Sequence, residues 1–295
     1  MLTIFTTTKP SIGEIGFIQR NAINSWRLLR PKPQILLFDN EKGAKKLAKD
    51  LKITHVPEVR KNEYGTPLVR DIFEKAQSLA KNRILAYVNA DIILMQDFME
   101  AISRIKFDKF VLVGQRRDID IKKNIRFQKG WREKLRKIVA KESKLHGPSG
   151  IDYFVFPKGF FSNIPNFALG RTLWDNWFLY KAWISGATLI DATEVITAIH
   201  QNHKVHLPRG HKKNVWKGPE AKMNQTLAGG LSRAFTIRDC SKLLTKEGLE
   251  NPKVDFYRIF SAPFRYYDKL PALKPFLFFG WLVFLIWRKI KIIKT

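Results

Sequence analysis

The chain has a single cysteine, Cys240, among its 295 residues. It can therefore form no intramolecular disulfide and offers no cysteine-based metal cluster, which fits a reducing, cytoplasmic setting. Acidic residues are also scarce: 26 Asp and Glu stand against 53 Lys and Arg, and the formal net charge is +27. Such a charge indicates an anionic partner, and by itself it leaves open nucleic acid, an anionic lipid surface or phosphorylated small molecules.

Long apolar runs are scarce as well. Residues 1–7 have neither a basic start nor a long apolar stretch, so we expect no secretory signal. Residues 275–287 run without a charge, but a spanning helix needs about 20 apolar residues. Because this run contains Trp281 and Trp287 and is followed by Lys and Arg, we expect a monotopic anchor at the cytoplasmic membrane face. The alternative is a buried helix.

Several enzyme signatures are missing from the sequence. It contains no P-loop, no dinucleotide-binding glycine pattern and no G-x-S-x-G element, which argues against P-loop kinases, dehydrogenases and serine hydrolases. It also lacks the H-E-x-x-H pattern of hydrolytic zinc sites. The enzyme classes that remain must be sought in the order of strands and helices.

Strand-like and helix-like segments alternate along the first two thirds of the chain. This alternation predicts an α/β fold with a mostly parallel central sheet flanked by helices. The predicted strands cover residues 2–6, 34–38, 53–56, 84–88, 110–114, 151–157, 187–191 and 195–199. The predicted helices cover residues 16–29, 43–51, 67–80, 173–185 and 219–228.

The segment 116–144 is the most basic part of the chain, with twelve Lys and Arg against four Asp and Glu. We expect no core there. Trp131, Leu135 and Val139 recur at helical spacing, which predicts a basic amphipathic helix. Two interpretations stay open: a solvated helix packed by one stripe, or a face that contacts anionic lipid or an acceptor.

Two polar clusters suit a divalent cation. Asn89 and Asp91 directly follow the apolar strand 84–88, and ligands of open α/β sheets bind at the carboxyl ends of strands. A carboxylate there suits Mg²⁺ or Mn²⁺, although Asp is also a common turn former. His200 and His203 follow a second predicted strand, and neutral imidazole binds Mn²⁺-class metals. The alternative for both histidines is a surface or core role.

Two further carboxylates lie beside apolar segments. Asp175 stands between Trp174 and Trp177 at the start of a predicted helix. It is either a helix N-cap or a general base whose pKa is raised by its aromatic neighbours, and the indoles suit sugar rings. Asp152 lies at the start of the predicted strand 151–157, and it is either a group that hydrogen-bonds substrate or a satisfied residue at the strand start.

Together these elements resemble GT-A nucleotide-diphospho-sugar glycosyltransferases. The resemblance is carried by Phe38-Asp39, by Gly65-x-x-x-x-Arg70, by Asn89-Ala90-Asp91 and by a longer block formed by residues 150–157, 164–177 and 200–203. It extends from Leu2 to Gly230. It implies one GT-A domain over 1–230, with a donor-binding half over 1–115 and an acceptor half over 116–230. Residues 231–295 would then form a basic helical region that contains the apolar anchor.

The resemblance also implies roles for individual residues. Asp91 would bind Mn²⁺ or Mg²⁺ together with His200 or His203, and Asp175 would be the base of an inverting transfer. The implied donor-binding residues are Thr6, Asp39, Arg70, Asn89 and Asp91. The implied acceptor-binding residues are Asp152, Trp174 and Trp177. The first Asp of the family's metal motif is replaced here by Asn89.

The resulting hypothesis is a glycosyltransferase that moves a sugar from a nucleotide-diphospho-sugar, with a UDP-sugar favoured, to a hydroxyl of a glycan or lipid-linked acceptor at an anionic membrane. One alternative is a nucleotidyltransferase on the same fold. Another is a basic protein that binds nucleic acid or lipid without catalysis, although no nucleic-acid-binding motif is present and nucleic acid is not the expected partner.

Overall fold

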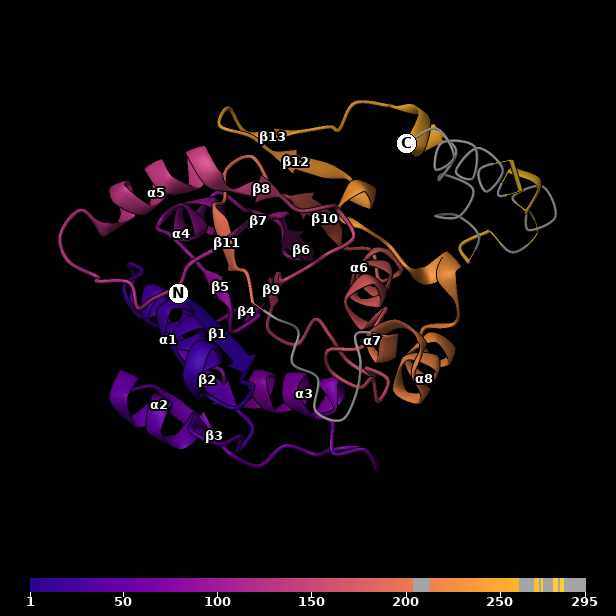
Figure 1. Cartoon of the computed structure of the whole chain (residues 1–295). Coiled ribbons are helices and arrows are strands. Elements are labelled where there is room, and N and C mark those ends of the chain that lie inside the picture. Colours follow the sequence, from indigo (N-terminus) through magenta and orange to yellow (C-terminus); the bar gives the residue numbers. More distant parts are fainter. Residues whose placement is uncertain (204–212, 260–267, 271, 273–277, 281, 284–295) are drawn as a thin grey trace.

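The computed structural model describes residues 1–203, 213–259, 268–270, 272, 278–280 and 282–283, and Figure 1 shows their arrangement. The centre is an α/β unit in which one large sheet lies between two layers of helices. The predicted fold class is therefore confirmed at the level of an α/β fold with a mostly parallel sheet. Most of the expected anchor at 275–287 lies outside the described residues.

Within the described residues the large sheet has nine strands. Their spatial order is β13 (Leu249–Glu250), β12 (Lys242–Leu244), β10 (Thr188–Asp191), β6 (Phe110–Val113), β9 (Tyr153–Pro157), β4 (Ile84–Val88), β1 (Leu2–Thr7), β2 (Gln34–Phe38) and β3 (Thr54–Val56). Strand β9 runs antiparallel to β4 and β6, and β13 runs antiparallel to β12. The other pairs are parallel, so the carboxyl ends of β1, β2 and β4 share one edge.

Alternate residues of these strands enter two separate cores. Helices α1 (Gly13–Arg27), α2 (Ala44–Leu51) and α4 (Asp97–Ser103) cover one face of the sheet. Helices α3 (Val69–Leu79) and α6 (Trp174–Ile184) cover the other. Because both faces are covered, the strands are apolar throughout, as is typical of parallel sheets.

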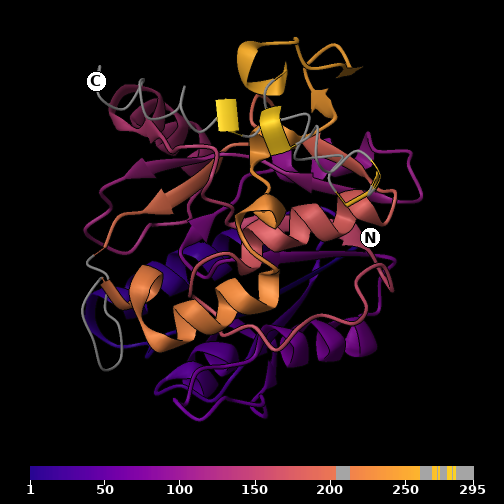
Figure 2. The ribbon, with the colours of Figure 1, turned by 90° about the vertical axis from the view of Figure 1, so that its right-hand side faces the viewer.

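The remaining helical elements follow residue 212. They are α7 (Lys213–Lys217), α8 (Pro219–Ala228) and two 3-10 turns, η1 (Leu231–Arg233) and η2 (Ile237–Asp239). Figure 2 shows α8 beside α6, with which it is in contact. The first domain expected from the sequence ends at residue 230. Strands β12 and β13 follow this residue in the chain and form one edge of the large sheet.

A second, smaller sheet was not foreseen. Its order is β5 (Ile92–Ile93), β11 (Ala198–Gln201), β7 (Arg116–Ile119) and β8 (Lys144–Leu145), and α5 (Trp131–Glu142) covers it. Trp131, Leu135 and Val139 of α5 pack into this third core. The expectation that 116–144 builds no core is therefore wrong, since one apolar stripe is enough to bury this basic helix against a small sheet.

No helix among the described residues combines the length and the apolar character that crossing a bilayer requires. The expected attachment through the C-terminus therefore stays a prediction.

Phe73 lies at the centre of the core between α3 and the sheet. Its ring is fully buried and lies 4.9 Å from the Phe5 ring and 4.5 Å from the Phe178 ring, centroid to centroid. We expect Phe73→Ala to lower the free energy of unfolding by about 3–5 kcal/mol, because the cavity adds to the lost burial. The control is Leu79→Ala on the same helix, where the side chain is 45% exposed. Equal urea midpoints for the two variants would contradict this packing.

Candidate active site

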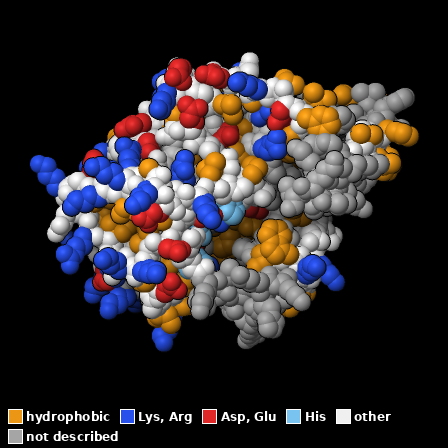
Figure 3. Space-filling model, turned by 45° about the horizontal axis from the view of Figure 1, so that its top comes forward, with side chains coloured by type: hydrophobic (Ala, Val, Ile, Leu, Met, Phe, Trp, Pro, Cys, Tyr) orange, Lys and Arg blue, Asp and Glu red, His pale blue; other side chains and the backbone are white. Residues whose placement is uncertain are grey.

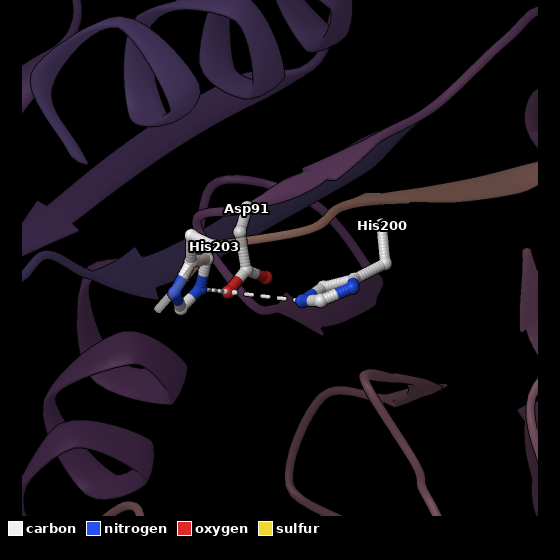
Figure 4. Close-up of side chains that lie close together, drawn as sticks. All are labelled: Asp91, His200 and His203. Carbon is white, nitrogen blue, oxygen red and sulfur yellow. Dashed lines mark hydrogen bonds and ion pairs between the residues drawn. The ribbon is translucent and has the colours of Figure 1, made fainter. Parts of the chain in front are cut away.

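Three side chains converge at the edge of the large sheet. Asp91 follows β4, His200 lies on β11, and His203 follows β11 by two residues. His203 Nε2 lies 3.2 Å from Asp91 Oδ2, and His200 Nε2 lies 3.8 Å from the same oxygen. Figure 4 shows the carboxylate between the two imidazoles. One potential ligand atom from each residue lies within 4.8 Å of the others.

The charge balance of this cluster favours an ionised Asp91. Burial alone would raise the pKa of the Asp91 carboxyl, but the hydrogen bond with His203 and the charges of His200 and Lys9 hold this pKa well below its usual range. The second oxygen, Asp91 Oδ1, is buried and accepts no hydrogen bond from the described residues. An ionised carboxylate with an unpaired buried oxygen and two imidazoles is a donor set that fits Mn²⁺.

Arg116 on β7 connects the cluster to the centre of the sheet. Its Nη1 donates to both oxygens of Asp152 at 2.8 Å, and its Nε donates to Asp118 Oδ1 at 2.8 Å. The other oxygen of Asp118 lies 2.8 Å from His146 Nδ1. Asp118 Oδ1 also lies 3.0 Å from His200 Nδ1, which makes no hydrogen bond with a described residue. A series of ion pairs therefore extends from Asp152 through Arg116 and Asp118 to His200.

Sequence reasoning missed Arg116, Asp118 and His146. Arg116 and Asp118 stand close together in the sequence, where they are interpreted only as part of the basic segment 116–144. Their relation to the site depends on the parallel pairing of β7 with β11, which sets Asp118 opposite His200. No local pattern predicts a pairing between strands more than 80 residues apart in the chain.

Removing Arg116 would leave two carboxylates without their cation. The guanidinium is largely buried, and its pKa is raised: burial would lower it, but Asp152 and Asp118 outweigh that effect. We expect Arg116→Ala to lower the free energy of unfolding by about 3–5 kcal/mol. Arg117→Ala is the control, because Arg117 is the exposed neighbour on the same strand. A thermal unfolding midpoint of Arg116→Ala equal to that of Arg117→Ala would refute the role of the network.

Asn89 ties the loop after β4 to β9. Its Nδ2 donates to Asp152 Oδ1 at 2.8 Å, its backbone N–H donates to Asp152 O at 2.9 Å, and its Oδ1 accepts from Tyr87 OH at 3.0 Å. Asn89 and Asp152 therefore lie close together. Both carboxylate oxygens of Asp152 accept hydrogen bonds, from Asn89 and Arg116, so Asp152 holds these two side chains in place.

Asp175 is in the first turn of α6, whose N-cap position is taken by Leu173. It is therefore not the N-cap itself. Burial raises the pKa of the Asp175 carboxyl to about 7; the backbone amides of Asn176, Asp175 and Ile151 oppose this, and the charge of Asp152 adds to it. The contact with Ile151 sets Asp175 beside the Asp152–Asn89 link. A carboxylate with this pKa can accept a proton near neutral pH.

The two indoles that flank Asp175 belong to the core. Trp174 and Trp177 are 5% and 6% exposed, and their rings pack against Phe178 among others. Little of either indole is open to a ligand. An exposed indole that sequence reasoning missed is Trp216 on α7, which is 64% exposed. Its neighbour Val215 accepts a backbone hydrogen bond at 3.1 Å from Thr172, three residues before Asp175.

The other three expected donor-binding residues, Thr6, Asp39 and Arg70, lie on β1, directly after β2 and on α3. Asp39 ends β2 with a φ of 77° and is buried, and its Oδ1 lies 3.0 Å from Lys61 Nζ. Both residues line a surface pocket together with Asn40, Pro57, Glu58, Val59, Arg60 and Lys75. Thr6 on β1 is fully buried. Arg70 on α3 instead pairs with Glu74 on the same helix at 2.8 Å, and within the described residues it makes no hydrogen bond or ion pair with Asp39 or Asp91.

Figure 3 shows the face of the molecule on which histidine side chains reach the surface. They border a hollow with an apolar floor, and Lys and Arg side chains lie close to it. The Lys and Arg side chains on this face would attract an anionic ligand such as a nucleotide.

No family model matches the sequence, and no curated protein matches it. Solved glycosyltransferase structures are similar to it in fold. The mannosyltransferase PcManGT from Pyrobaculum calidifontis, in complex with GDP-Man and Mn²⁺, aligns with 79% of this chain and 77% of its own at 13% identity and a TM-score of 0.45. S. aureus TarS in complex with UDP-GlcNAc aligns with 95% of this chain and 86% of its own at 12% identity and a TM-score of 0.47.

A third match is GalNAc-T7 with UDP, GalNAc and Mn²⁺, which covers 78% of this chain and 48% of that protein at 16% identity and a TM-score of 0.49. Similarity at this level describes the fold, so the chemistry has to be judged from the side chains of the site.

Proposed function

We propose that this chain is a glycosyltransferase that moves a sugar from a nucleotide-diphospho-sugar to a hydroxyl group. The observation that carries the proposal is a donor set for a divalent cation after β4 together with a second carboxylate, Asp175, whose pKa is raised by burial to about 7. Trp174, which precedes Asp175, packs its ring against Tyr87, and the Tyr87 hydroxyl donates to Asn89 in the loop that carries Asp91. Cation and base are the groups that sugar transfer from a diphosphate requires.

Asp91, His200 and His203 would hold Mn²⁺ or Mg²⁺. A divalent cation bound there supplies charge that offsets the negative charge developing on the departing nucleoside diphosphate. Asp91 contributes an ionised oxygen because its pKa is held low, and the imidazoles contribute neutral nitrogens. Asn89 holds the loop that carries Asp91 through its bonds to Asp152.

Asp175 would accept the proton of the acceptor hydroxyl as this oxygen attacks the anomeric carbon. Its raised pKa lets the carboxylate bind the proton released during attack and return it to solvent near pH 7. Attack on the face opposite to the leaving diphosphate gives inversion. Trp174 and Trp177 lie in the same turn of α6 and are nearly fully buried, so they would help to keep water from this turn.

Asp39 and Lys61 at the pocket beyond β2 are the groups we assign to the nucleobase, with Thr6 shaping the strand end next to it. The carboxylate accepts and the ammonium donates, so the pair can bond a base edge on two sides. Arg70 can reach a phosphate only by leaving Glu74, an exposed pair of modest strength. UDP-sugars are the donors we would test first.

The acceptor we propose is a glycan or a lipid-linked sugar presented at a membrane. Because the two buried indoles have little free surface, the exposed Trp216 is the aromatic side chain best suited to stack on an acceptor sugar. The backbone bond between Val215 and Thr172 fixes its helix near the turn that carries Asp175.

The test is a screen for nucleotide release. The purified chain is incubated with UDP-, GDP-, dTDP- and CMP-sugars in the presence of Mn²⁺, Mg²⁺ or EDTA, and released nucleotide is measured. We expect release from one diphospho-sugar donor with metal and none with EDTA. Pyrophosphate formation from a nucleoside triphosphate and a sugar phosphate would instead identify a nucleotidyltransferase. No release and no thermal shift with any nucleotide would refute the proposed donor site.

A further inference from the structure

The outer surface of α5 and of the loop before it is strongly basic. Within residues 122–144 the exposed acids are Glu133 and Glu142. The exposed bases are Lys122, Lys123, Arg126, Lys129, Lys134, Arg136, Lys137, Lys141 and Lys144. Among the ion pairs of the described residues, Arg136 is the member of this set that takes part, with Asp97 at 3.2 Å. Carboxylates of the described chain therefore leave most of this charge uncompensated.

One flank of α5 gathers three of these lysines around an apolar side chain. Lys134, Lys137 and Lys141 are three and four positions apart, so they are neighbours on the helix surface. Ile138 lies among them and is 44% exposed. Like charges at this spacing destabilise a helix by a few tenths of a kcal/mol per pair. An external anionic partner would remove that repulsion.

The uncharged side chains of this surface distinguish between anionic partners. Ile138 and Leu145 are aliphatic and 44% and 48% exposed, a form suited to entry between lipid headgroups. Nucleic-acid surfaces instead offer aromatic rings on which bases stack. The two rings of this segment, Phe127 and Trp131, pack against each other with centroids 4.8 Å apart, and Trp131 is buried. The aliphatic exposure favours lipid.

We propose that the α5 surface, meaning the exposed residues of 122–145, docks on an anionic lipid bilayer. The lysines contact headgroup phosphates, and Ile138 and Leu145 enter the interfacial region. Leu145 is followed by His146, whose Nδ1 is 2.8 Å from Asp118 Oδ2, and Asp118 is the register partner of His200. Docking would therefore bring the candidate metal cluster close to the headgroups, where a lipid-linked acceptor presents its hydroxyl. This last consequence rests on the proposed function, whereas the docking does not.

The experiment measures binding of the full-length chain to vesicles of phosphatidylcholine with and without phosphatidylglycerol, in the absence of nucleotide and metal. The test variant carries Lys134→Glu, Lys137→Glu and Lys141→Glu. The matched control carries Lys45→Glu, Lys46→Glu and Lys49→Glu on α2, where three exposed lysines undergo the same change of charge. At about 1 kcal/mol per lysine, we expect the α5 variant to lose on the order of 100-fold in partition onto anionic vesicles. The α2 variant should change by less than about threefold, because α2 lies at the opposite end of the molecule from α5 in Figure 1.

A third variant, Ile138→Ser, separates insertion from charge attraction. We expect it to weaken vesicle binding on the order of tenfold and to leave binding to a single-stranded oligonucleotide unchanged. Equal losses for the α5 and α2 variants would overturn the proposal, because net charge alone would then explain binding. So would vesicle binding that survives the α5 changes, or an α5 variant that loses only oligonucleotide binding. Nucleotide release from a soluble donor should be the same for the α5 variant and the wild type, so its absence in both would instead refute the proposed function.

Discussion

Asp175→Asn is expected to lower kcat for sugar transfer by a factor on the order of 10³–10⁴, because asparagine cannot accept the proton of the acceptor hydroxyl. Donor and Mn²⁺ binding should remain within about threefold of wild type, since Asp175 is assigned no contact with either ligand. Transfer rates and nucleotide affinity, measured on the same preparation, test both statements. A variant that keeps more than a tenth of the wild-type kcat would contradict the role of base.

The pH dependence follows from the pKa of Asp175, which burial raises to about 7. The base must be ionised to act, so the rate should rise with pH and level off above 7, with an apparent pKa near that value. The same shift affects stability. The folded state holds the proton more tightly than the unfolded chain, so ionisation costs stability as pH rises from the ordinary value of 3.8 to about 7. Asp175→Asn should therefore unfold no earlier than wild type at pH 8.

A matched control is Asp191→Asn. Asp191 ends β10, which is separated from β4 by the two strands β6 and β9, and burial raises the pKa of its carboxyl as well. Its oxygen accepts hydrogen bonds from the backbone and hydroxyl of Thr193, and no described contact joins it to Asp91 or Asp175. We expect the activity of this variant to change by less than about threefold. A loss equal to that of Asp175→Asn would mean that buried carboxylates act through stability alone.

Asp91→Asn is expected to lower Mn²⁺ affinity by 100-fold or more, because an amide oxygen replaces the ionised ligand; outer-shell changes alone cost about 10- to 100-fold. His203→Gln should lower it as well, since His203 Nε2 lies 3.2 Å from Asp91 Oδ2. Titration of the chain with Mn²⁺, followed by electron paramagnetic resonance of the free ion, measures both affinities. Nucleotide release should fall in parallel.

The control for the imidazole is His55→Gln. His55 lies on β3, and its Nε2 contacts the backbone oxygen of Asp39 at 2.9 Å, away from the cluster. Its Mn²⁺ affinity should equal that of wild type. Wild-type affinity in Asp91→Asn would contradict the assignment of the metal site, whatever the activity of that variant.

Most strands of the large sheet and most helices on its faces could be predicted from the sequence because their signals are local, whereas β12, β13 and α4 were not predicted. Apolar runs such as 84–88 became β4, and the helical spacing near residue 70 became α3. The small sheet could not be predicted, because β5 and β8 have two residues each and β7 carries three charged side chains. Strands this short form by pairing with distant segments of the chain, and this pairing leaves no periodic pattern in the sequence.

In the candidate site, too, the residues with a local signal could be predicted and those that depend on strand pairing could not. Asp91 follows an apolar strand and Asp175 lies between indoles, so both positions could be singled out from neighbouring residues. Arg116 and Asp118 needed the pairing of β7 with β11 before their relation to His200 became visible. The exposure of Trp174 and Trp177 was also undecidable from sequence, because α6 is apolar on nearly all sides and its orientation depends on what it packs against.

The most direct measurement is nucleoside diphosphate release from the preferred diphospho-sugar donor by wild type, Asp91→Asn and Asp175→Asn, each with Mn²⁺ and with EDTA. We predict release by wild type with Mn²⁺ alone, near-complete loss in both variants, and retained Mn²⁺-dependent nucleotide binding in Asp175→Asn. Release that is unaffected by EDTA and by both substitutions would contradict the account, because neither the metal cluster nor the carboxylate would then take part in the reaction.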